Sequence, residues 1–196
     1  MFHVIRAAKA ITNCHSILVI GSQAVLGHCL SKNFNFSFND SMEIDIVAMP
    51  ELPALNFCDL LDGSIGEESM FHHTFGYYGH GVKSKTAKFP PCWNHRILTI
   101  QVPGSGEDPY SVFFPSTEDL VLSKYLAGRD KDREFVRKVI AEDMVDQEKL
   151  FKLLALYPPE ILDAESMMRT RQALESDLLL HGEKSKLASG EHPNAF

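Results

Sequence analysis

A run of branched apolar residues, 17–20, ends abruptly at Gly21 and Ser22. So short a run, followed by turn-forming residues, predicts a buried strand that leads into a tight turn. The next residues, 24–30, contain no proline and suit a helix. Because such a strand must bury its side chains against other layers, we expect an α/β fold with a small, mixed, twisted sheet flanked by helices.

The stretch 42–47 alternates charged and apolar residues with a period of two, which predicts another strand. Glu43 and Asp45 then project from one face of that strand, while Ile44 and Ile46 face the core. Two carboxylates on one face can share a divalent cation, and magnesium suits such a site because its other ligands come from water and phosphate. The alternative is an amphipathic edge strand whose acids are only solvated.

The rest of the chain mixes short β-type runs with helical patterns. The expected strands cover one or two segments of 71–82, then 96–102 and 110–114, and the expected helices cover 51–62, 116–127, 130–140, 147–156 and 161–180. From these elements we expect a domain over 1–140, a helical appendage over 141–180 and a mobile tail over 181–196.

The composition of the chain argues against two classes of function, sequence-independent nucleic-acid binding and membrane insertion. The 196 residues include 26 Asp and Glu against 19 Lys and Arg, a formal charge of −7, so we expect no broad positive surface for sequence-independent nucleic-acid binding. No apolar run approaches the ~18 residues of a membrane span, and the N-terminal segment has no signal-peptide core. We therefore expect a cytoplasmic protein with no membrane partner.

Two further features suit a phosphate-bearing ligand. The turn at Gly21 and Ser22 combines a residue that accepts a positive φ with the free N–H groups of a helix start, although such turns also occur for geometry alone. Lys124 is the single charge in the apolar stretch 120–127, so that helix should be largely buried. Its ammonium either meets a phosphate in a cleft or extends along the surface into water.

Three histidines form a weaker candidate site. His72, His73 and His80 carry imidazole ligands, yet neighbouring residues of a strand face opposite ways, so a shared metal would need a bulge or turn. Metal sites also normally need three or more convergent ligands. We therefore assign no metal role to these histidines.

Three segments of the chain together resemble the polymerase-beta-type nucleotidyltransferase superfamily. They are the apolar strand that leads into Gly21-Ser22, the strand with Glu43-Ile44-Asp45, and the run from Glu118-Asp119-Leu120 through Lys124, Ala127 and Arg129 to Lys131-Asp132. The resemblance covers about residues 15–140. Within the superfamily, the sequence is similar to a bacterial branch that includes nucleotidyltransferases of abortive-infection toxin–antitoxin systems. It implies a metal site at Glu43 and Asp45. It also implies a nucleotide-binding set that consists of Gly21, Ser22, Lys124, Arg129, Lys131 and Asp132.

The resemblance implies magnesium-dependent binding of a nucleoside triphosphate and transfer of its nucleotidyl group to an unidentified hydroxyl acceptor. Catalytic roles would fall to Glu43, Asp45 and Lys124. Active members commonly supply a third carboxylate from a later strand, but 97–102 and 110–114 contain no acid. The alternative is therefore a catalytically degenerate interaction protein, such as one component of a toxin–antitoxin pair with a small protein partner.

Overall fold

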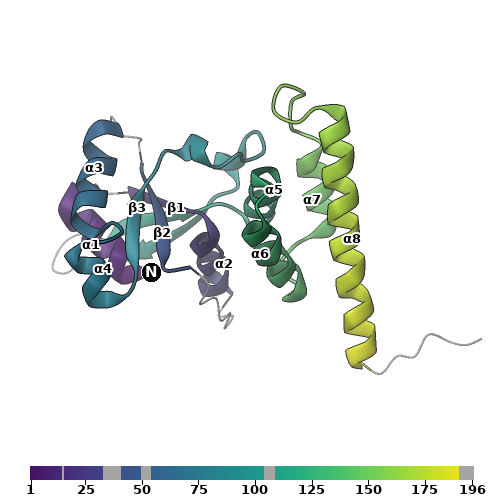
Figure 1. Cartoon of the computed structure of the whole chain (residues 1–196), viewed down its shortest axis with the longest axis horizontal. Helices are drawn as coiled ribbons and strands as arrows, with labels where there is room; N and C mark the ends of the chain where they lie inside the picture. Colours follow the sequence, from purple (N-terminus) through teal and green to yellow (C-terminus); the bar gives the residue numbers. More distant parts are fainter. Residues whose placement is uncertain (15, 33–40, 50–53, 104–108, 190–196) are drawn as a thin grey trace, which may run out of the picture.

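The computed structural model describes residues 1–14, 16–32, 41–49, 54–103 and 109–189, and it shows a sheet flanked by helices (Figure 1). Within these residues the sheet has five strands in the order β3-β2-β1-β5-β4. The expectation of a small mixed sheet flanked by helices is confirmed. None of the helices in the described part of the chain has both the length and the apolar character that a membrane span needs.

The strands are short, and their order places β1 in the centre of the sheet. Their bounds are Ser16–Ile20 for β1, Glu43–Ala48 for β2, Tyr78–Gly81 for β3, Leu98–Val102 for β4 and Tyr110–Phe114 for β5. Strand β1 is antiparallel to β2 and parallel to β5, β2 is parallel to β3, and β4 is antiparallel to β5. Because a central strand is covered on both faces, residues 17–20 are all apolar and buried.

Helices of the first half of the chain cover the sheet and extend past its β3 edge (Figure 1). They are α1, α2, α3 and α4, which span Phe2–Thr12, Val25–Ser31, Ala54–Ile65 and Met70–Phe75. Helix α2 packs against β4 and β5. A Cβ atom at Gly27 would lie 2.3 Å from the ring of Phe114, so only glycine lets this helix lie so close to β5.

The second half of the chain after β5 is helical. Its helices are α5, α6, α7 and α8, which span Thr117–Ala127, Asp130–Ala141, Gln147–Leu154 and Ala164–Ser189. Helix α8 packs on α6 and α7 on the side away from the sheet (Figure 1). It continues past Leu180, so the tail expected over 181–196 is helical as far as Ser189, and 190–196 lie outside the described residues.

Helix α5 begins and ends where its sequence predicts. The Ser116 hydroxyl accepts a hydrogen bond from the Asp119 N–H, which caps the first turn. At the other end Gly128 adopts the left-handed conformation, with φ of 70°. The helix is buried from Thr117 to Lys124, as the apolar stretch that begins at Leu120 predicts, so this element forms part of the core.

The segment 71–82 differs from its expected strand structure. Residues up to Phe75 form helix α4, because the Ser69 hydroxyl accepts from the His72 N–H at its start and Gly76, with φ of 74°, ends it. Only 78–81 form a strand. The aromatic composition of the segment predicts one or two strands, but the capping residues Ser69 and Gly76 favour a helix over its first part.

A buried carboxylate joins α5, α6 and α8. Asp177 on α8 accepts hydrogen bonds from the hydroxyl of Tyr125 on α5 and, at 2.9 Å, from Nε of Arg137 on α6. The carboxylate is only 5% exposed. It therefore fixes the position of α5 relative to α6, and these two helices carry one wall of the site described next.

Candidate functional site

The acids of β2 form one wall of a cleft. Along β2, Glu43 and Asp45 are partly exposed, whereas Ile44 and Ile46 are buried. The side chain of Glu43 is 35% exposed and that of Asp45 27%, so both carboxylates reach solvent from a single face of the sheet. The alternation predicted from the sequence is therefore observed.

The turn after β1 lies directly against Asp45. Ile20, the last residue of β1, pairs with Asp45 across the two strands. Gly21 follows with φ of 70°, and a Cβ atom at this position would lie 2.1 Å from Oδ2 of Asp45. Both the backbone angle and the close approach require glycine. Ser22 then opens a short 3₁₀ turn, Ser22–Ala24, which precedes α2.

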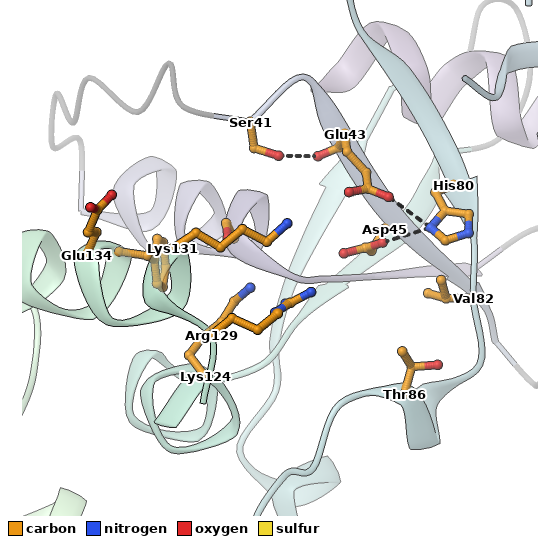
Figure 2. Close-up of a pocket in the computed structure, with 12 residues that line it drawn as sticks. Ser41, Glu43, Asp45, His80, Val82, Thr86, Lys124, Arg129, Lys131 and Glu134 are labelled. Carbon is orange, nitrogen blue, oxygen red and sulfur yellow. Dashed lines mark hydrogen bonds and ion pairs between the residues drawn. The ribbon is translucent and has the colours of Figure 1, made fainter. Parts of the chain in front are cut away.

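His80 joins the two acids from the neighbouring strand. Strand β3 runs parallel to β2 and pairs His80 with Asp45. The imidazole Nδ1 lies 3.0 Å from Oε1 of Glu43 and 3.3 Å from Oδ1 of Asp45 (Figure 2). One ligand atom from each residue lies within 4.8 Å of the others, an arrangement that can hold a metal ion. The sequence pattern groups His80 with His72 and His73, but these two histidines lie on α4 and His80 lies on β3.

The order of the strands explains why the sequence alone does not predict that His80 lies beside the two acids. The resemblance leads us to expect a third carboxylate in 97–102 or 110–114, the segments that contain β4 and β5. These strands lie on the far side of β1, and the strand beside the two acids is β3. The residue paired with Asp45 on β3 is His80. An imidazole therefore occupies the strand position from which a side chain can meet both acids.

The opposite wall carries cations that share one buried acid. On α5, Nζ of Lys124 lies 3.0 Å from Oδ1 of Asp132 on α6. Arg129 donates from Nε to Oδ2 of Asp132 at 2.6 Å. Burial opposes ionisation of Asp132, which is 1% exposed, but the hydrogen bonds from Arg129 and Lys124 outweigh it and lower the pKa of its carboxyl. Asp132 therefore stays charged and fixes both cations.

A cleft of about 370 Å³ separates the two walls. Figure 2 shows Lys124, Arg129 and Lys131 extending from the helices toward Glu43 and Asp45. The described residues that line the cleft are Ser22, Ser41, Glu43, Asp45, His80, Val82, Thr86, Lys124, Arg129, Lys131, Glu134 and Phe135. Of the predicted set, Gly21 lies at the cleft's edge beside Asp45, and Asp132 lies behind the cations.

The acidic wall is electrostatically unfavourable by itself. Burial and the charge of Glu43 raise the pKa of Asp45, and His80 and Lys124 offset this only in part. A cation between the carboxylates would remove that cost. The donors on this wall are carboxylate oxygens and one imidazole nitrogen, which are ordinary ligands of divalent metal ions.

Another cavity of about 370 Å³ adjoins the cleft. The two share Asp45, Thr86, Lys124 and Arg129, and the walls of the second cavity are largely apolar. The remaining residues that line it are Ile20, Gly21, Ala87, Lys88, Leu120, Ser123, Leu126 and Ala127. The shared residues therefore stand between two spaces, each large enough for part of a small substrate.

Comparison with protein families identifies the chain. Neither the curated proteins nor the solved structures gave a match. A family model described as "Nucleotidyltransferase of unknown function (DUF6036)" matches residues 1–175, which include both walls of the cleft. The finer relation to toxin–antitoxin proteins stays a prediction. Because the match extends over most of its length, the chain belongs to this family of nucleotidyltransferases.

Proposed function

We propose that the protein binds a nucleoside triphosphate with a divalent cation and transfers the nucleotidyl group to a hydroxyl acceptor. The observation that carries this proposal is the cleft in which Glu43 and Asp45 face Lys124, Arg129 and Lys131. A triphosphate needs cations around its oxygens, and a metal–phosphate complex needs carboxylates on the metal. Membership of a nucleotidyltransferase family supports the same reaction.

The acidic wall fits a magnesium ion. Glu43 and Asp45 supply carboxylate oxygens, and the raised pKa of Asp45 indicates that a cation at this place is favourable. A bound ion would supply charge neutralisation at the reacting phosphate. Gly21 keeps the backbone beside Asp45 clear of any side chain, and we assign the space next to Ser22 to the phosphates.

The basic wall is arranged before the substrate binds. Lys124 and Arg129 are held by Asp132, so little side-chain entropy is lost when they meet a phosphate. In the reaction the acceptor oxygen bonds to the α-phosphorus, the bond from that phosphorus to the β-phosphate oxygen breaks, and the hydroxyl proton passes to solvent. Lys124 offsets the charge that develops on the departing pyrophosphate.

We assign the adjoining apolar cavity to the acceptor, because it shares Asp45, Lys124 and Arg129 with the cleft. Ala127→Trp tests this assignment, since Ala127 is exposed, lines only that cavity and ends its helix. Label transfer should fall while triphosphate affinity remains. The control is Ala155→Trp, another exposed alanine at a helix end. Equal transfer by both variants would place the acceptor elsewhere.

The proposed function is tested by calorimetric titration with each nucleoside triphosphate, with and without magnesium, followed by incubation with α-labelled nucleotide. We expect magnesium-dependent binding that Asp45→Asn removes and that Asp59→Asn, an exposed acid on α3, leaves unchanged. Binding without label transfer would support the non-catalytic alternative. Equal affinity with and without magnesium would contradict the metal role of the acidic wall.

A further inference from the structure

We propose that Glu43, Asp45 and His80 form a mixed carboxylate–imidazole centre that binds a first-row transition ion such as Mn²⁺ more tightly than Mg²⁺, with Asp62 holding the imidazole in position. This inference rests on the proposed function in using the same acidic wall. It adds a ligand, a preference among metals and a positioning residue.

The distances suit one ion shared by three side chains. Adjacent ligands of an octahedral ion with bonds of about 2.1 Å lie about 3 Å apart. Nδ1 of His80 lies 3.0 Å from Oε1 of Glu43 and 3.3 Å from Oδ1 of Asp45. The same separations allow an imidazole N–H to bridge the two carboxylates, so the ligands are gathered before an ion binds. Strand pairing fixes this arrangement, since His80 stands beside Asp45 in the parallel ladder.

A purely structural role does not account for His80. Its side chain is 44% exposed, so it contributes little to the core. On either side of it, Gly79 and Gly81 pack closely against other elements: a Cβ at Gly81 would lie 2.5 Å from Cα of Cys58 on α3. The neighbours of His80 serve packing, whereas its own side chain points into the cleft (Figure 2).

The imidazole changes which metal the centre prefers. Carboxylate and water suit Mg²⁺, Ca²⁺ and Mn²⁺, whereas imidazole suits transition ions and adds little for Mg²⁺, which is bound mainly by oxygen. A centre with two carboxylates and one imidazole therefore favours transition ions. Among these Mn²⁺ shares the oxygen preference of Mg²⁺, so it is the probe that isolates the effect of the nitrogen ligand.

Asp62 lies behind the imidazole. From α3, its Oδ1 accepts a hydrogen bond of 2.7 Å from the Gly81 N–H, and its Oδ2 lies 4.0 Å from Nε2 of His80. Metal-bound histidines usually direct their second ring nitrogen toward a carboxylate, a carbonyl or a water, which fixes the ring and raises its basicity. Since 4.0 Å is too long for a direct hydrogen bond, Asp62 acts on the imidazole through its negative charge or through one bridging water.

The metal preference is tested on the full chain without nucleotide, with Mn²⁺ followed by electron paramagnetic resonance and Mg²⁺ by calorimetry. We expect the Kd for Mn²⁺ to be at least about tenfold lower than that for Mg²⁺. His80→Gln should weaken Mn²⁺ by about tenfold or more. The control is His73→Gln, an exposed histidine on α4, which should leave the affinity for Mn²⁺ unchanged. His80→Asp should strengthen Mg²⁺ binding, because it adds a third carboxylate, and should remove most of the preference for Mn²⁺.

Asp62→Asn tests the positioning role. Asparagine still accepts from the Gly81 N–H through its amide oxygen but removes the charge beside Nε2, so the fold should survive. We expect Mn²⁺ affinity to fall by about tenfold, with Mg²⁺ affinity nearly unchanged, whereas Asp59→Asn on the same helix changes neither. A loss equal for both ions would show that Asp62 acts on the fold rather than on the histidine.

Two results would overturn the proposal. One is equal binding of Mn²⁺ and Mg²⁺ by the unaltered protein, and the other is a Mn²⁺ preference that His80→Gln leaves intact. Since nucleotide is absent, failure of the proposed function is distinguishable: a His80-dependent Mn²⁺ site in a chain that binds no triphosphate would retain this inference and reject nucleotidyl transfer.

Discussion

The two walls of the cleft differ in how their charges are balanced. On the sheet side, Glu43 and Asp45 repel each other, and the pKa of Asp45 is raised. On the helix side, Lys124 and Arg129 share Asp132, whose pKa is lowered. The basic wall is therefore satisfied within the protein, while the acidic wall is stabilised most by a cation from solution. The comparison teaches that the charges of the basic wall are balanced inside the protein before any ligand binds, whereas those of the acidic wall are balanced only in part until a cation binds.

The largest expected effect comes from breaking the basic wall. Asp132→Leu leaves the ammonium of Lys124 buried without its carboxylate, so the free energy of unfolding should fall by about 3–5 kcal/mol. Adding Lys124→Met should recover much of this loss, because both charges are then replaced by apolar groups. Chemical denaturation of the two variants measures both free energies of unfolding. A double variant no more stable than Asp132→Leu would mean that Lys124 does not depend on this carboxylate.

Removal of Lys124 alone should affect binding more than folding. In Lys124→Met the aliphatic stem remains and Arg129 still neutralises Asp132, so the fold should survive. Triphosphate affinity should fall by roughly 1.5–3 kcal/mol, the range for a hydrogen bond to a charged group. Calorimetry measures the change, with Lys152→Met on α7 as control. Normal affinity in Lys124→Met would confine this lysine to a structural role.

A smaller effect should come from the acidic wall. Asp45→Asn removes one of two repelling carboxylates, so in metal-free buffer the protein should be more stable by up to about 1 kcal/mol. Thermal denaturation in a chelator measures the difference. Glu43→Gln is expected to act in the same direction. Destabilisation of both variants would show that the two acids support the fold, contrary to the repulsion between them that raises the pKa of Asp45.

The smallest effect is a difference in pH dependence. The lowered pKa of Asp132 contributes stability that is present above its ordinary value of 3.8 and is lost as pH falls through the folded value. The raised pKa of Asp45 acts oppositely, because protonation in the folded state relieves repulsion as pH falls toward 3.8. The advantage of Asp45→Asn should therefore shrink on acidification. A constant advantage from pH 7 to about 4 would contradict the raised pKa.

Local patterns were sufficient to predict most elements of the fold. The apolar run of β1, the alternation of β2 and the caps of α5 each depend on residues close in sequence, and each was predicted. The helix over 70–75 was missed because capping by Ser69 and Gly76 outweighs aromatic strand preference. Helix α1 was also not predicted from the sequence.

The candidate site was predictable only where its residues are neighbours in sequence. Glu43 and Asp45 share one strand, so period two was enough to bring them together. His80 meets them through pairing of β2 with β3, a long-range contact that no local pattern encodes. Burial of Asp132 likewise depends on how α6 packs on α5.

The contact between Gly21 and Asp45 also bears on how the acidic wall can vary. The Asp45 carboxylate fills the place where a side chain at position 21 would stand, so any other residue there would displace this carboxylate. A displaced carboxylate would no longer lie beside Glu43 and His80, with which it can hold a metal ion. The backbone of the turn and the ligand geometry of the cleft therefore depend on the same glycine.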